Sequence, residues 1–221
     1  MMGSQLVQII VLAGVALFLV LRLRSVLGTR DGYEDPINPA PVESNKSARK
    51  FDVIDGGGVD HDIADHIDPD SESAKALAAM KRVEPGFSVN DFMRGARQAY
   101  EMILMAFENG DLEFLEQYLA PDVYESFARV IEERVNKGLT VDATFVGVRE
   151  LKLRDARFDE ENREAEITLK FVGELTSVVR DADGRIVEGD PQTIKRQSDV
   201  WTFARLMGGE NPNWLLVGTG G

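Results

Sequence analysis

The chain contains no cysteine among its 221 residues. This absence excludes disulfide bonds, thiolate nucleophiles and cysteine-ligated zinc or iron–sulfur sites. Histidine is almost as scarce, because the two histidines, His61 and His66, both lie in the first third of the sequence. Residues 67–221 therefore cannot supply the histidine of a Ser-His-Asp catalytic arrangement. The fold must be held together by packing alone.

Basic residues are also outnumbered, since 25 Lys and Arg stand against 38 Asp and Glu, a formal net charge of −13. This balance argues against a nucleic-acid-binding protein, which needs a basic face for the phosphates. The charge is uneven: residues 1–30 carry +3, residues 31–86 carry −7 and residues 87–221 carry −9. The hydrophobic content of 43% is sufficient for a folded core in part of the chain.

The first segment, residues 1–28, has the pattern of a transmembrane anchor. Residues 4–21 contain no charge and are mostly Leu, Val, Ile, Ala and Phe. As a helix they would extend about 27 Å, close to the thickness of the hydrocarbon core. The alternative is a cleaved signal peptide, but here Arg22 and Arg24 follow the apolar run instead of preceding it. We therefore expect a single-pass protein of the bacterial inner membrane, with its N-terminus outside and its C-terminal domain cytoplasmic.

The second segment, residues 29–70, is predicted to be a disordered acidic tether. It contains half of the eight prolines, the run Gly56-Gly57-Gly58 and many Asp residues. Both histidines lie among these Asp residues, so a weak divalent-cation site is an alternative to a solvated tether. We assign no metal ligand here. A short amphipathic helix is expected over residues 71–83, ended by Pro85 and Gly86.

The third segment, residues 71–221, has the pattern of a compact α+β domain. Apolar residues recur with helical spacing over 88–109, 111–119 and 121–136. Alternating patterns typical of strands follow over 139–153, 165–179, 193–205 and 214–219, with a break in phase after Gly147 that indicates a bulge or kink. Helices followed by antiparallel strands predict three helices packed on a curved four-stranded antiparallel sheet, a cone-shaped cystatin-like or nuclear-transport-factor-like domain.

Two stretches carry a more specific signal. One runs from Gly86-Phe87 through the third expected helix, and the other is the C-terminal DVWTFARLMGGENPNWLLVGTGG, with its Trp-x-Phe-x-Arg and Pro-Asn-Trp-x-Leu motifs. Together they resemble the Tim44-like domain family, and most closely its bacterial members, which place one apolar anchor ahead of the domain. The resemblance implies a membrane-anchored, non-enzymatic adaptor without a cofactor, in protein translocation, insertion or envelope assembly. The implied partners are the inner membrane and membrane proteins, with no nucleic acid.

Aromatic residues of the domain are the candidate site. They could line an apolar pocket for an acyl chain or peptide, or form a partner surface, and the alternative is that they fill the core. The chain could then be a lipid-binding module, or a cone-fold enzyme whose general base would be Asp142, Glu150, Asp199 or a tyrosine. Asp199 could equally pair with Arg196 or Arg205 on the surface. No catalytic residue is assigned. The candidate residues are Phe92, Tyr100, Phe107, Phe127, Phe171, Trp201 and Trp214.

Overall fold

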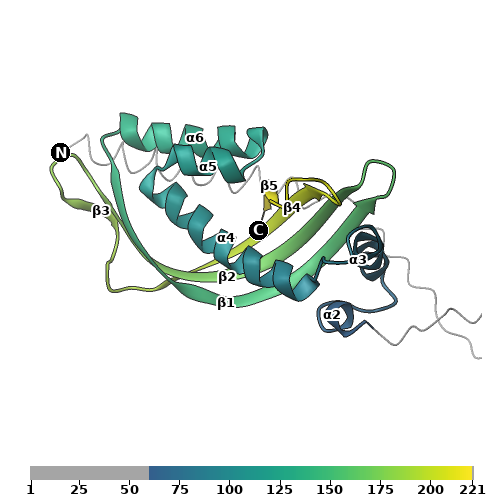
Figure 1. Cartoon of the computed structure of the whole chain (residues 1–221). Coiled ribbons are helices and arrows are strands. Elements are labelled where there is room, and N and C mark those ends of the chain that lie inside the picture. Colours follow the sequence, from purple (N-terminus) through teal and green to yellow (C-terminus); the bar gives the residue numbers. More distant parts are fainter. Residues whose placement is uncertain (1–59, 221) are drawn as a thin grey trace, which may run out of the picture. The chain divides into compact units, whose positions relative to one another are not determined.

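The computed structural model describes residues 60–220 (Figure 1). The predicted anchor, its flanking Arg22 and Arg24, and the tether up to residue 59 lie outside the described residues. Among residues 60–220, no helix combines the length and the apolar character needed to cross a membrane. The helices are α2 (His61–Ala64), α3 (Glu72–Val83), α4 (Val89–Asn109), α5 (Leu112–Tyr118) and α6 (Pro121–Asn136), and the strands are β1 (Thr140–Asp159), β2 (Glu164–Arg180), β3 (Ile186–Gly189), β4 (Lys195–Leu206) and β5 (Leu215–Gly220).

The strands form one antiparallel sheet in the order β1-β2-β4-β5, with β3 paired to β2. The α+β class and the antiparallel sheet are confirmed, but the sheet has five strands where four were expected. A turn follows β2 over residues 181–184, where the Asp181 amide donates to the Arg185 carbonyl at 3.0 Å. After it the chain forms β3, leaves the ladder over residues 190–194, where Pro191 lacks an amide hydrogen, and re-enters as β4.

β1 is bent, as the break in its hydrophobic phase predicted. Its pairing with β2 shifts register between Phe145 and Gly147, and twice more farther along. Each irregularity bends and twists the strand locally. Figure 1 shows the result, in which β1 and β2 curve around α4. The concave face of the sheet therefore receives α4.

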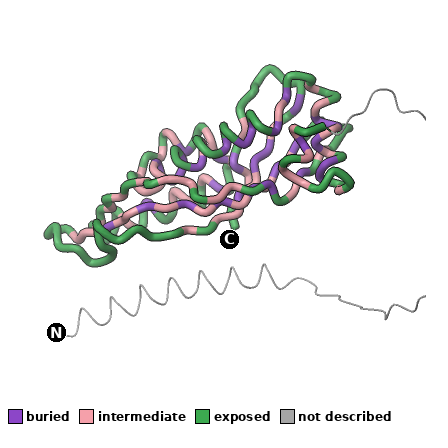
Figure 2. The backbone as a smooth tube through the Cα atoms, turned by 90° about the horizontal axis from the view of Figure 1, so that it is seen from below, coloured by how far each residue is buried: buried purple, intermediate pink, exposed green. Residues whose placement is uncertain are grey.

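The long helix α4 begins and ends where its capping residues require. The Ser88 hydroxyl accepts a hydrogen bond from the Asp91 amide at the start, and Gly110 at the end has a φ of 73°. Such a left-handed conformation favours glycine. The buried stripe of α4 faces the sheet, and α5 and α6 follow it at one end of the domain (Figure 1). Buried residues concentrate in the body of the domain, whereas all four residues of β3 are exposed (Figure 2).

The structure differs from the sequence-based prediction over residues 60–70, which were expected to belong to the tether. These residues form the helix α2 and the turn that leads to α3. Ile63 is buried and belongs to the hydrophobic core. Two isoleucines, Ile63 and Ile67, among many acids are a weak signal, which explains why the composition suggested disorder. The folded part of the chain therefore extends at least to residue 60.

The amphipathic helix expected over 71–83 is confirmed as α3, capped by Ser71. Leu77 and Met80 are fully buried beneath it. The Ser73 hydroxyl donates to the Asp155 carboxylate at 2.7 Å and accepts from the Ala156 amide at 3.0 Å. Both partners lie on β1, which is the edge strand at this side of the sheet. α3 thus covers and satisfies part of an otherwise open edge.

Candidate functional site

Three of the seven aromatic candidates form a closed stack at the centre of the domain. The rings of Tyr100 and Phe171 lie parallel, 4.4 Å apart at an interplanar angle of 6°, and Trp201 packs 4.7 Å from Tyr100. All three side chains are buried. Their facing surfaces are occupied by one another, so these residues act as core.

The hydroxyl of Tyr100 is hydrogen-bonded at the side of this stack. It donates to the Asp199 carboxylate at 2.6 Å, and the Gln197 side chain donates to the same carboxylate at 3.2 Å. Burial, together with the negative charge of Asp199, raises the pKa of Tyr100 well above its ordinary value. Asp199, considered as a general base from the sequence, therefore holds a neutral phenol in the core.

The other candidates form two groups, the first of which is linked to the stack through Phe203, 6.2 Å from both Phe92 and Trp201. Phe92 packs against Trp214, with ring centroids 4.7 Å apart, and both contact Phe87. Phe107 on α4 and Phe127 on α6 lie 4.9 Å apart. Phe107, Phe127 and Trp214 are only partly buried, so these three are the aromatic candidates that reach the surface.

The two C-terminal motifs meet at Arg205. Its guanidinium donates to the Glu84 carboxylate at 2.8 Å and to the Pro212 carbonyl at 3.2 Å, and it lies over the Trp214 ring, 5.1 Å from the centroid. Only 8% of the Arg205 side chain is exposed. Arg205, from the first motif, thus contacts Pro212 and Trp214 of the second motif and also binds Glu84 at the end of α3.

Glu84 completes this arrangement from the other side. Its carboxylate also accepts from the Gly208 amide at 2.9 Å. Burial alone would raise its pKa, but the Gly208 amide and the Arg205 guanidinium outweigh burial and lower the pKa below its ordinary value. The sequence analysis did not single out Glu84, because its partners lie more than 120 residues away.

A second network, also missed from the sequence, is centred on Asp62. Its carboxylate accepts hydrogen bonds from the amides of Val89 and Asn90 at 2.8 Å each, at the start of α4, and lies 2.7 Å from the Lys81 ammonium. Burial opposes the charged form, but Lys81 and these amides hold the pKa of Asp62 well below its ordinary value. A carboxylate at a helix N-terminus satisfies amides that have no partner within the helix.

The Asp/His segment is thus used for structure. Lys81 also contacts Asp60 at 2.8 Å, and His66 Nε2 lies 2.9 Å from the Asn90 side-chain oxygen. Over residues 60–220, no three His, Asp or Glu side chains are arranged to hold a metal ion. The segment connects α2, α3 and the N-terminus of α4.

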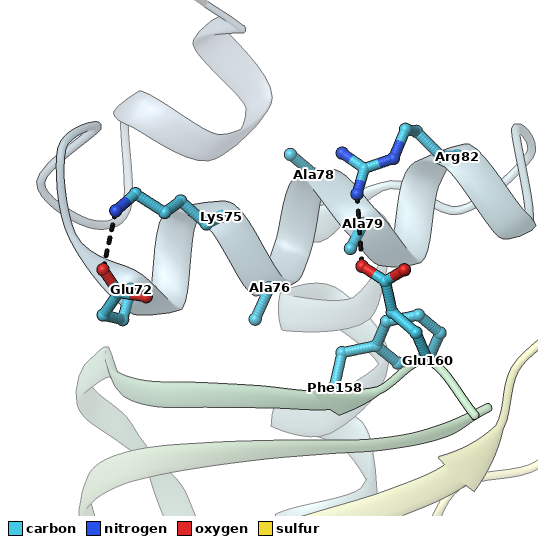
Figure 3. A pocket seen from close by; sticks show the side chains of 8 residues that line it. All are labelled: Glu72, Lys75, Ala76, Ala78, Ala79, Arg82, Phe158 and Glu160. Carbon is cyan, nitrogen blue, oxygen red and sulfur yellow. Dashed lines mark hydrogen bonds and ion pairs between the residues drawn. The ribbon is translucent and has the colours of Figure 1, made fainter. Parts of the chain in front are cut away.

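Among the hollows on the surface of residues 60–220, two shallow ones can be described. One, between α3 and the end of β1, has an apolar floor of Ala76, Ala79 and Phe158 (Figure 3). Ion pairs lie at its two ends, Glu72 with Lys75 at 2.6 Å and Arg82 with Glu160 at 3.4 Å. The other is formed by Gln98, Glu101, Met102 and Met105 on α4. Neither hollow is lined by the seven aromatic candidates.

Comparison with known proteins identifies the family. The model of the Tim44-like domain matches residues 73–221 of this chain. The chain belongs to the Tim44-like domain family. The matched region contains α3 to β5, and with them Glu84, Arg205 and Trp214, so both sequence motifs lie within it.

The curated relatives are similar at modest identity. The human mitochondrial import inner membrane translocase subunit TIM44 is 27% identical over 150 residues, which cover 66% of this chain and 33% of that protein. The probable subunit tin-44 of Caenorhabditis elegans is 24% identical over 164 residues, covering 72% and 38%. This chain thus spans about a third of the length of these relatives. The solved intermembrane-space region of the chloroplast protein ARC6 covers 56% of this chain and 93% of its own at 12% identity, with a TM-score of 0.36.

Proposed function

We propose that this protein is a membrane-anchored, non-enzymatic adaptor that works in protein translocation, insertion or envelope assembly. The observation that carries the proposal is the Tim44-like domain over residues 73–221, because the similar curated proteins are named as subunits of an inner-membrane translocase. The match covers only about a third of those proteins. We therefore propose an adaptor role without assigning to this chain any binding partner of the mitochondrial proteins.

The anchor is the second part of the proposal. The uncharged run over residues 4–21 is long enough to cross a bilayer as a helix, and Arg22 and Arg24 follow it. Positive residues are retained on the cytoplasmic side, so the domain would lie in the cytoplasm of a bacterium, beside the inner membrane. We propose the boundaries 1–28 for the anchor and 29–59 for the tether. A tether raises the effective concentration of the domain near membrane partners.

The alternative of a lipid-binding module depends on the aromatic candidates. Tyr100, Phe171 and Trp201 pack against one another, which supports a role in the core. An acyl chain could enter beside the partly buried Phe107, Phe127 or Trp214 or occupy one of the two hollows described above, and both of these hollows are shallow. A partner protein needs no such cavity, and this difference favours the adaptor.

Two experiments test the proposal on the full-length chain. A reporter fused after Gly221 should show that the C-terminus lies on the cytoplasmic side of the membrane. A reporter signal found only on the outer side would overturn the proposed topology. A photo-crosslinking residue at Lys75, beside the hollow of Figure 3, or at Met102 should capture a membrane protein of a translocation or assembly machine. Recovery of lipid alone at both positions would replace the adaptor by the lipid-binding module.

A further inference from the structure

The far end of the sheet has strand edges without a partner strand. Within residues 60–220, β3 pairs with β2 alone, and β4 pairs with β5 only from Val200 to Ala204. The outer sides of β3 and of residues 195–198 in β4 are therefore unpaired there, and we call them together the open edge. Figure 1 shows β3 at the end of the sheet opposite to α2 and α3. Free backbone amides and carbonyls at such an edge are a template for another strand.

At and beside the open edge, several β-branched apolar side chains are exposed, as expected for a strand that another strand would cover. Ile186 and Val187 on β3 are 48% and 55% exposed, and Ile194, directly before β4, is 53% exposed. β-branched residues favour the extended conformation. Natural edge strands are usually blunted by charge or covered, as α3 covers β1 through Ser73. In the open edge, β3 presents two half-exposed apolar side chains and β4 presents the charged Lys195 and Arg196, with the half-exposed Ile194 directly before them.

Arg196, on the β4 part of the open edge, has an excess of positive charge beside it. Arg196 Nε lies 2.8 Å from the Glu174 carboxylate, and Arg149 contacts the same oxygen at 3.6 Å. Two guanidinium groups thus share one carboxylate. The neighbouring Lys195 interacts instead with Glu108, which also has Glu188 near it, so the excess of positive charge is confined to Arg149 and Arg196. Residues 87–221 carry −9 in total, so this positive region is local. An acidic side chain is the group that it would attract.

We propose that the open edge binds an extended acidic segment of a partner protein as an added strand. The segment would lie beside Lys195–Ser198, in the row that β5 occupies farther along β4, with backbone hydrogen bonds to β4. Successive side chains of a strand alternate between faces, so Arg196 and Ser198 share one face. A carboxylate of the added strand lies beside Arg196, and the apolar side chains of that strand lie on its opposite face. This inference deepens the proposed adaptor role and rests on it for the statement that the partner is a protein.

The test uses fluorescent peptides and the full-length chain in detergent micelles, with binding measured by anisotropy. The probe is Val-Glu-Val-Glu-Val-Glu, compared with its Lys counterpart and with a copy N-methylated at alternate residues, which cannot pair with a strand edge. The Glu peptide should bind at least about tenfold more tightly than either comparison peptide. Hydrogen exchange should slow over residues 195–198 when it binds.

Two substitutions connect this binding to the edge. Arg196→Glu should weaken the Glu peptide by about tenfold or more, while Arg157→Glu, at an exposed position on β1, should leave it unchanged. If the N-methylated peptide binds the wild-type chain as tightly as the Glu peptide, the peptide does not bind as an added strand. This comparison does not depend on any variant being folded. Absence of saturable binding up to about 1 mM would overturn the inference as a whole. Either failure leaves the topology and crosslinking tests of the adaptor role unaffected, so the two proposals can fail separately.

Discussion

At the scale of single residues, Gly173 decides how closely the central aromatic stack can pack. A Cβ atom at this position of β2 would lie 2.6 Å from the Tyr100 hydroxyl oxygen and 2.9 Å from a ring carbon. Tyr100 cannot move aside easily, because it is stacked on Phe171 and hydrogen-bonded to Asp199. The absence of a side chain at Gly173 therefore allows the tyrosine to be buried.

Gly173→Ala should lower the free energy of unfolding by about 1–3 kcal/mol, the usual cost of overpacking a core. The measurement is urea denaturation followed by circular dichroism. Gly147→Ala on β1 is the matched control, because no atom lies within 4 Å of a Cβ built there. Equal stability of the two variants would show that Tyr100 is not held in the observed position.

Asp62 gives a prediction about pH. Asp62→Asn should lower the free energy of unfolding by about 2 kcal/mol at pH 7, since the charged cap of α4 and the Lys81 contact are lost. The pKa of Asp62 is depressed in the folded state, so its contribution is present above the ordinary value of 3.8 and is lost as the pH falls through the folded value. The difference between wild type and variant should therefore shrink when denaturation is repeated below about pH 4.

The exposed Asp65, on the same segment, supplies the control for this experiment. Asp65→Asn should change stability by less than about 0.5 kcal/mol at either pH. A difference between wild type and Asp62→Asn that stays constant from pH 7 to acid would contradict the assignment of the effect to the ionised carboxylate.

At the scale of elements, Arg205 connects α3, β4 and the loop before β5. Arg205→Lys should lower the free energy of unfolding by about 2 kcal/mol, because one ammonium group cannot replace the fork that reaches both Glu84 and Pro212. Thermal denaturation measures this loss. The same substitution at the exposed Arg157 should have almost no effect. A similar small effect at Arg205 would mean that the motif does not stabilise the fold.

The elements also show what the sequence could and could not predict. α4 and α6 were predictable because long apolar stripes coincide with strong boundary residues, Gly110 after α4 and Pro121 at the start of α6. β3 was not, because four exposed residues give no periodic signal and its pairing depends on β2. The aromatic residues were correctly placed in the domain, but only spatial proximity separates the closed stack at Tyr100 from the more exposed pair of Phe107 and Phe127.

At the scale of the whole molecule, the position where the folded part begins determines which fragments are stable. Composition placed this boundary at residue 71, because residues 60–70 are rich in Asp and carry a single strongly buried apolar residue. Their contacts with the rest of the domain are long-range: Asp62 caps α4 and binds Lys81, and Ile63 joins the core. Such long-range contacts leave no trace in local composition.

A fragment of residues 60–221 should accordingly be more stable than one of residues 71–221, by about 2–4 kcal/mol, since the shorter fragment loses both a charged helix cap and a buried isoleucine. Urea denaturation of the two purified fragments measures the difference. A 60–221 fragment carrying Asp62→Asn and Ile63→Ala together should resemble the shorter fragment, which assigns the loss to these two side chains and not to chain length. If both fragments unfold at the same urea concentration, α2 does not belong to the cooperative unit, and the folded domain begins at α3.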